Sequence, residues 1–296
     1  MKTKVLTLFS VILMAAMFFS CSSDDDDNIK PVNVPSAVMS AFNQAYPNTT
    51  PKWSENDTYY VAEFGSDNNE VDVWFTADGT IMLTVKEIST AQLPQAIKTS
   101  IAATKYATWT YDDVKFIQRK GFDDLYKVEM DDPKSESDVT LYYTKDGILV
   151  REVPDIDNSP IIPAVVPQTI IDQLDQYFPD KVYKILDFDY EASTKTYEVD
   201  IIEYNIPIEV VFNNSQVLVY WQWETTLAKV TDVVKNAYLN LGYTVNQIDD
   251  IYFRETPNAS PRENVTTYIF EIEVNNIDRQ IIINENGTVL SDNIIK

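Results

Sequence analysis

The chain has 296 residues, with 23 basic and 46 acidic side chains, no histidine and a formal net charge of −23 at pH 7. This acidity argues against nucleic acid as a partner, because phosphate binding needs a basic face. Cationic ligands, divalent metal ions and basic protein surfaces remain compatible, although acidity can also serve only to keep a surface protein soluble. The 45% hydrophobic content and the length predict a sizeable core in about two domains.

The N-terminus has the pattern of an export signal. Lys2 and Lys4 precede an apolar run over residues 5–19, which is shorter than the roughly 20 residues of a transmembrane helix and typical of a signal peptide over residues 1–20. Ser20 then places a small residue before Cys21, the only cysteine. This arrangement resembles the bacterial lipobox, which implies a diacylglycerol and a palmitate on Cys21. The alternatives are an ordinary signal peptide and an uncut anchor.

An acidic stretch follows the cysteine and predicts a lipidated tether over residues 21–33. Adjacent carboxylates repel one another and bury nothing, so the stretch should be solvated. It resembles the surface-export signal of Bacteroidetes lipoproteins, which implies the outer leaflet of the outer membrane; a plain spacer on the periplasmic face is the alternative. The residues of the signal are Ser22, Ser23, Asp24, Asp25, Asp26 and Asp27.

A strand, tight turn and strand pattern recurs four times along the chain. Asp or Asn followed by Gly between β-rich flanks predicts a hairpin, because these residues tolerate the positive φ of the turn. The turn residues are Asp78 and Gly79, Asp146 and Gly147, and Asn286 and Gly287, with Gln216 at the equivalent place in a weaker third copy. The spacings between Gly79, Gly147, Gln216 and Gly287 are 68, 69 and 71 residues, which predicts an internal repeat.

Each hairpin is preceded by an alternating segment with the order aromatic, any residue, apolar, acidic, apolar. Such alternation predicts a strand with one apolar face and one solvated acidic face. The four segments are Tyr60–Phe64, Tyr126–Met130, Tyr197–Ile201 and Phe270–Val274.

Each repeat opens with apolar residues at helical spacing. Pro35, Pro94 and Pro167 stand before the first three of these stretches, where proline suits a helix start, and the fourth runs from Leu227 to Leu241 without one. One more strand is expected between each helix and the alternating segment. The predicted fold class is therefore α+β, with four repeats of one helix and about four antiparallel strands.

The helix, the aromatic and acidic strand and the hairpin together resemble PepSY-like domains, which are similar in fold to the beta-lactamase inhibitor protein. The resemblance covers nearly all of residues 34–295. A segment with three prolines and two aspartates then divides the four repeats into two pairs, which predicts two domains of two repeats each. The predicted boundaries are 34–153, with repeats 34–88 and 89–153, a linker over 154–163, and 164–295, with repeats 164–224 and 225–295. Whether paired repeats share one sheet stays open.

Side chains for catalysis are few. The absence of histidine removes the usual general base, and no glycine-rich phosphate loop occurs. Neighbouring acids such as Asp112 and Asp113 are typical of surface turns, so no catalytic residue, resident metal or cofactor is predicted; clustered acids leave calcium as an alternative. Trp221 and Trp223 lie two apart on a strand and are candidate binding aromatics, although burial under a helix is the preferred interpretation.

The resemblance implies a non-catalytic lipoprotein that acts as a binding or inhibitory module for a protein or peptide. The alternative is a structural or ligand-sequestering surface protein that binds calcium or a glycan. A membrane partner follows from the lipid on Cys21, and neither reading includes nucleic acid.

Overall fold

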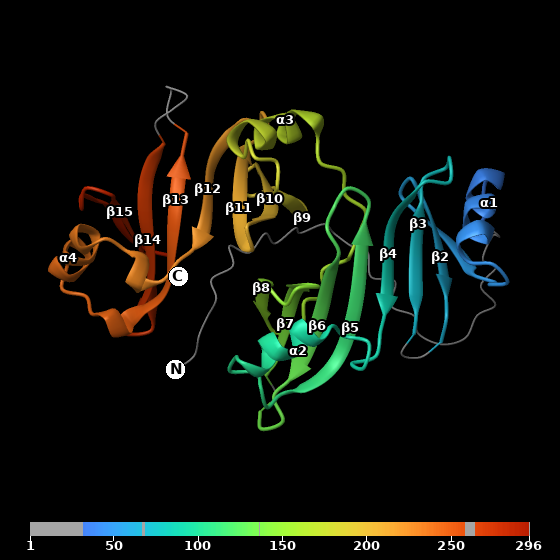
Figure 1. The fold of residues 1–296 in the computed structure, drawn as a ribbon, viewed down its shortest axis with the longest axis horizontal. Coiled ribbons are helices and arrows are strands. Elements are labelled where there is room, and N and C mark those ends of the chain that lie inside the picture. The colour runs from blue at the N-terminus through green and yellow to red at the C-terminus, as the bar shows by residue number, and fades with distance from the viewer. Residues whose placement is uncertain (1–31, 67–68, 136, 258–263, 296) are drawn as a thin grey trace. The chain divides into compact units, whose positions relative to one another are not determined.

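The computed structural model describes residues 32–66, 69–135, 137–257 and 264–295 (Figure 1). The described residues divide into two compact units, one within 32–148 and 155–165 and the other within 149–154 and 166–295. The described residues form two antiparallel sheets of eight strands and four α-helices. This confirms the two-domain layout of helices and antiparallel strands, with more of the chain in strands than in helices.

The first sheet has the strands in chain order, β1 to β8. Its strands are β1 (Lys52–Asn56), β2 (Tyr59–Phe64), β3 (Val71–Phe75), β4 (Ile81–Glu87), β5 (Thr110–Arg119), β6 (Leu125–Asp131), β7 (Asp138–Thr144) and β8 (Leu149–Pro154). Its helices are α1 (Ser36–Ala45) and α2 (Gln95–Ala102). Because β4 pairs with β5, the first two repeats share one continuous sheet.

The second sheet has the same meander order, β9 to β16. Its strands are β9 (Lys184–Glu191), β10 (Thr196–Glu203), β11 (Ile206–Asn213), β12 (Leu218–Glu224), β13 (Ile248–Thr256), β14 (Val265–Val274), β15 (Ile277–Asn284) and β16 (Val289–Ile294). Its helices are α3 (Gln168–Tyr177) and α4 (Asp232–Asn240). The pairing of β12 with β13 joins the third and fourth repeats in the same way.

Two kinds of residue start the helices. Pro35, Pro94 and Pro167 are the N-cap residues of α1, α2 and α3, where their missing N–H group costs no helical hydrogen bond. In α4 the N-cap is Thr231, whose side chain accepts a hydrogen bond from the Val234 N–H. The fourth repeat thus replaces proline with a side-chain cap.

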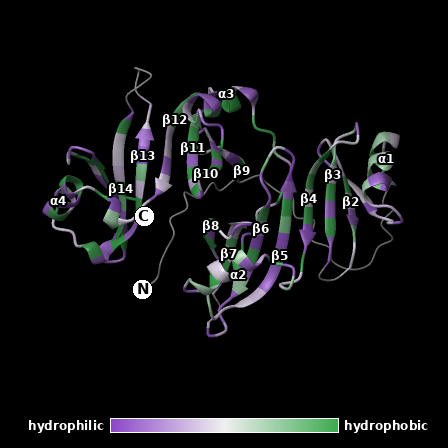
Figure 2. Ribbon diagram, viewed as in Figure 1, coloured by the Kyte–Doolittle hydropathy of each residue, from purple (hydrophilic) through white to green (hydrophobic). Residues whose placement is uncertain are grey.

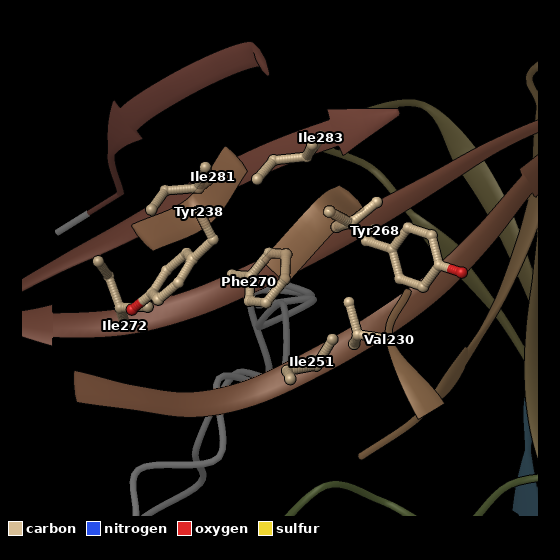
Figure 3. Close-up of a cluster of buried hydrophobic side chains, with 9 residues drawn as sticks. Val230, Tyr238, Ile251, Tyr268, Phe270, Ile272, Ile281 and Ile283 are labelled. Carbon is tan, nitrogen blue, oxygen red and sulfur yellow. The ribbon is translucent and has the colours of Figure 1, made fainter. Parts of the chain in front are cut away.

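Each helix covers one face of its sheet with a small apolar stripe. In the fourth repeat the ring of Tyr238, on α4, stacks on Phe270 of β14 at 4.7 Å between centroids, surrounded by isoleucines of β14 and β15 (Figure 3). In the first repeat Val38 and Phe42 of α1 pack on buried residues of β2 and β3. Hydrophilic and hydrophobic bands follow one another along the strands in Figure 2, as alternation requires.

One face of each sheet therefore packs on the helices, and we refer to the other as the helix-free face. No helix of the described residues is long and apolar enough to cross a membrane.

Candidate binding site

The strand register places one acidic residue of each repeat at the same point of the helix-free face. These residues are Glu63, Glu129, Asp200 and Glu271, paired across the hairpin with Asp72, Thr140, Glu209 and Gln280. Each partner lies seven residues before the turn residue Gly79, Gly147, Gln216 or Gly287. We call these four acids the repeat acids.

The fourth alternating segment is two residues away from where the sequence pattern places it. The register aligns Tyr268–Ile272 with the other three segments, so the repeat acid is Glu271 and not Glu273. The prediction failed because Phe270–Val274 has the same order of residue types, and a pattern of period two cannot distinguish a shift of two residues.

The repeat acids of the first sheet have cationic partners. Glu63 lies at the edge, where its Oε2 is 3.6 Å from the Lys52 ammonium, with the side chain 42% exposed. Glu129 is only 7% exposed and its Oε1 is 2.7 Å from Nζ of Lys127, itself 4% exposed. The prediction that the acids lie on a solvated face is wrong for Glu129, because the residues after β8 cover this part of the sheet.

The repeat acids of the second sheet lie among other carboxylates. The pKa of Asp200 is held well above its usual range by burial and by the charges of Asp187 and Glu209, which face it from β9 and β11. Burial also raises the pKa of Glu271 to about 7, and the charge of Asp250 adds to the effect. Oε2 of Glu271 is buried without a hydrogen-bond partner in the described part of the chain.

A third carboxylate on this face behaves similarly. Glu198 lies two residues before Asp200, and burial, together with the charges of Glu209 and Asp189, raises its pKa to about 7. A cation placed beside these carboxyls would lower their raised pKa values, so the charge of the face depends on any cation that approaches it.

A hydrogen-bonded network crosses the middle of the same face. Gln222 Nε2 donates to Glu209 Oε1 at 3.1 Å, and Gln222 Oε1 accepts from Nε and Nη2 of Arg254 at 2.9 and 2.7 Å. The Tyr220 hydroxyl donates to Glu209 Oε1 at 3.3 Å, and the guanidinium of Arg254 lies 3.9 Å from the centroid of the Tyr220 ring. Four side chains from three strands are thereby fixed in position.

No local pattern in the sequence indicates this network. Its members face one another only through the pairings of Glu209 with Gln222 and of Gln222 with Arg254. The alternation along β11, β12 and β13 was a usable indication of the face, but the register between β12 and β13 depends on a long connection through α4. Glu209 and Arg254 are 45 residues apart in sequence.

The hairpin turn residues pack on the helix of their own repeat. Gly79 and Gly147 have φ of 86° and 80°, and a Cβ at either would lie 2.7 or 2.6 Å from a backbone oxygen of α1 or α2. At Gly287, with φ of 81°, an added Cβ would instead lie 2.8 Å from the Val233 side chain of α4 and 3.3 Å from its backbone oxygen. Asp78 accepts a hydrogen bond from the Thr80 N–H, and the exposed Asp146 and Asn286 complete the turns of their hairpins.

The candidate binding aromatics lie on the side of the sheet that faces the helix. Trp221 is 5% exposed, and its ring lies 5.6 and 6.0 Å from those of Tyr177 and Phe178, at the end of α3. Trp223 is partly buried, with its ring 4.6 Å from that of Phe253. Trp221 therefore serves packing, as the preferred interpretation expects.

The remaining sequence-predicted sites fall into two groups. Cys21 and the acidic residues Ser22–Asp27 lie outside the described residues. Within the described ranges, no three acidic or thiol side chains gather closely enough to hold a metal ion.

Comparison with known proteins places the chain in a family. The family model described as beta-lactamase-inhibitor-like, PepSY-like matches residues 58–151 and 155–219, which is more than half of the chain. The chain therefore belongs to the PepSY-like, beta-lactamase-inhibitor-like family. This confirms the family that the repeat motifs predict.

Several solved structures from Bacteroides are similar to less than half of the chain. A BLIP-like protein from Bacteroides fragilis is 28% identical and covers 47% of this chain and 100% of its own, with a TM-score of 0.41. A DUF2874 family protein from Bacteroides ovatus is 25% identical over 42% of this chain and 89% of its own, with a TM-score of 0.37. A Bacteroides eggerthii protein described as periplasmic is 22% identical over 42% and 90%, also with a TM-score of 0.37. No curated protein matches the chain.

Proposed function

We propose that the protein is a non-catalytic cell-envelope module that binds a protein or peptide on the helix-free face of its second sheet. The observation that carries this proposal is the set of partly buried carboxylates with raised pKa, Glu198, Asp200 and Glu271, beside the network of Arg254. The name of the family, beta-lactamase-inhibitor-like, supports a binding or inhibitory role.

The chemistry of the face favours a basic side chain of the partner. Burial, together with the charges of neighbouring carboxylates, raises the pKa of Glu198 and of Glu271 to about 7. An ammonium or guanidinium group placed beside them would stabilise the charged carboxylates and offer donors to the buried Oε2 of Glu271. Charged and polar groups held in position on one face also favour specificity for a partner of complementary charge.

The test is a comparison of what two charge-matched variants capture from the cell envelope. The face variant carries Glu198→Gln and Asp189→Asn, and the control carries Asp172→Asn and Asp232→Asn on the exposed sides of α3 and α4. Both variants lose two carboxylates from the same unit. We expect a partner to be retained by the wild type and the control, and to be lost or weakened at least tenfold with the face variant.

Three outcomes would contradict the proposal. If both variants capture the same proteins as the wild type with equal affinity, the helix-free face is not the binding site. If calcium raises the melting temperature of the wild type and of the control but not of the face variant, and no protein is captured, the ligand-sequestering alternative holds. Hydrolysis of a peptide or glycan panel above background would contradict the non-catalytic assignment.

We also propose that lipid on Cys21 anchors the module to the outer membrane, with the acidic tether directing it to the cell surface. The supporting features are the signal-peptide pattern, the cysteine and the four aspartates behind it. Cys21→Ser should move the protein from the membrane fraction to the soluble periplasm and abolish labelling with palmitate. Replacing Asp24–Asp27 with Asn should retain the label but protect the protein from protease added to intact cells. Exposure unchanged by that replacement would favour a plain spacer.

A further inference from the structure

The residues after β8 do not leave the first sheet but turn back over its helix-free face. Asp155, with φ of 78°, makes the turn, and its N–H donates to the Asp138 carbonyl at 3.0 Å. Its carbonyl accepts from Thr140 Oγ1 at 3.2 Å, and it forms an isolated parallel bridge with Val139. The part of the predicted linker over 155–159 is thus docked on β7, and we call it the strap.

Asp157 holds the strap in place, with 8% of its surface exposed. All four of its polar groups are engaged. The Tyr142 hydroxyl donates to Oδ2 at 2.8 Å, and the Ser159 N–H donates to Oδ1 at 3.0 Å. The backbone N–H donates to Thr140 Oγ1 at 2.8 Å, and the carbonyl accepts from Lys127 Nζ at 2.5 Å.

The sheet side of this contact is specific to the second repeat. Lys127 lies two residues before the repeat acid Glu129, and the equivalent residues of the other repeats are Val61, Glu198 and Ile269. The only lysine of the four is therefore where the strap lands. Glu129 pairs with the same ammonium at 2.7 Å, which fixes its position under the strap.

We propose that Lys127, Thr140 and Tyr142 form a binding site for an extended peptide segment that carries an aspartate, and that the strap is its resident occupant. The contact has the composition of a docked peptide, because the backbone N–H, the backbone carbonyl and the carboxylate of one residue each meet a dedicated side chain of the sheet. Backbone contacts favour an extended segment, whereas the tyrosine hydroxyl beside the lysine favours a carboxylate.

The strap competes with any segment supplied from outside. A short tether gives an effective local concentration on the order of millimolar, so an external peptide binds only weakly while the strap is seated. The site is on the first sheet and does not depend on the partner proposed for the second.

The test uses the full chain and a capped peptide with the sequence of residues 153–160. We expect this peptide to bind the Asp157→Ala variant at least tenfold more tightly than it binds the wild type, since the variant strap loses its carboxylate contacts and competes less well. The matched control is Asn158→Ala, which alters an exposed strap residue and should bind as the wild type does. A peptide with asparagine in place of the aspartate should bind the variant at least tenfold more weakly.

A second measurement does not depend on the folding of a variant. In the wild type, hydrogen exchange of the Asp157 amide, which donates to Thr140, should accelerate when the peptide is present at several millimolar, and the asparagine peptide should have no effect. Equal binding of both peptides to Asp157→Ala, or no binding by a folded variant together with unchanged exchange in the wild type, would show that the strap is only a structural tie.

Discussion

The two sheets share one design and differ in how they treat the same four acids. On the first sheet, Glu63 and Glu129 each meet a lysine. On the second, Asp200 faces two carboxylates and Glu271 faces an amide, Gln280, and the pKa of each acid is raised. An identical position in the repeat thus yields acids paired with lysines in one unit and, among the described residues, acids without a lysine partner in the other.

In these repeats, one set of residues determines the fold and a separate set determines the chemistry of the helix-free face. The turn glycines and the helix stripes recur because each repeat must close its hairpin on its own helix. The residues of the helix-free face do not contact the helix and can differ between repeats. A lysine two residues before the acid, Lys127, therefore gives Glu129 an environment that differs from those of the other repeat acids. Sequence periodicity therefore predicts the fold well, but it predicts the environment of side chains on the helix-free face poorly.

The largest expected effect is that of Lys127→Met. The substitution leaves Glu129 buried without its cation and removes the donor to the Asp157 carbonyl. Breaking a buried pair in this way costs roughly 3 to 5 kcal/mol. Urea denaturation, combined with hydrogen exchange in β6 to identify the first sheet, measures the loss.

The control for Lys127→Met is Lys52→Met, in which the partner of Glu63 is also removed. Lys52 is 76% exposed at its side chain, so the loss should be below about 1 kcal/mol. Equal losses in the free energy of unfolding would show that the buried pair under the strap and the exposed pair at the edge contribute equally to stability.

The hairpin contacts of the first sheet should be the next most sensitive. In Gly79→Ala, the strain of the positive φ adds to the clash of the new Cβ with the Ala37 carbonyl oxygen, 2.7 Å away. Together they should lower the free energy of unfolding by roughly 2 to 4 kcal/mol. Gly121→Ala provides the control, because Gly121 has φ of 90° but no atom within 4 Å of the added Cβ. In thermal unfolding, the melting temperature should fall clearly more for Gly79→Ala than for Gly121→Ala. Equal shifts would show that the contact of the new Cβ with the helix does not contribute.

The acidic face should make the stability of the second sheet depend on pH. A carboxyl whose pKa is about 7 when folded and near 4.5 when unfolded binds more protons in the folded state between these values. Stability is then fully present below about pH 4.5 and falls as the pH rises through 7. We expect the urea midpoint of the wild type to be lower at pH 8 than at pH 5.5.

Glu271→Gln isolates the contribution of one acid to that pH dependence. The amide keeps the shape and can still accept the hydrogen bond from Gln280. The variant should gain on the order of 1 to 2 kcal/mol at pH 8 and little at pH 5.5. Glu63→Gln on the first sheet is the comparison and should show no gain at pH 8. A pH profile of Glu271→Gln identical to that of the wild type would contradict the assigned environment.

Much of the fold could be predicted from the sequence, because hairpin turns and helical stripes are local patterns. The spacing of Gly79, Gly147, Gln216 and Gly287 defines all four repeats. The site could not be predicted to the same degree, since the network of Arg254 depends on register across sequence-distant strands. The docking of Asp157 on Tyr142 was equally hidden, because a proline-containing segment between repeats is typical of a spacer.

The smallest expected effect concerns the turn of the third repeat, where Gln216 stands at the position that glycine has in the other three repeats. Gln216 has φ of 59°, and its side chain is hydrogen-bonded to Thr169, while its carbonyl accepts from Gln173 of α3. In Gln216→Gly the relief of the left-handed conformation, about 1 kcal/mol, opposes the loss of the hydrogen bond to Thr169, which is worth a similar amount. The free energy of unfolding should therefore change by less than about 1 kcal/mol.

The reciprocal variant, Gly287→Gln, should be clearly destabilising, because its Cβ would lie 2.8 Å from the Val233 side chain. Urea denaturation of both variants measures this asymmetry. Equal effects would mean that the third and fourth repeats hold their helices by the same contact. An asymmetry would show that in the third repeat a side-chain hydrogen bond between turn and helix replaces the close approach of a turn glycine to the helix. The repeats would then hold the hairpin turn against its helix in two different ways.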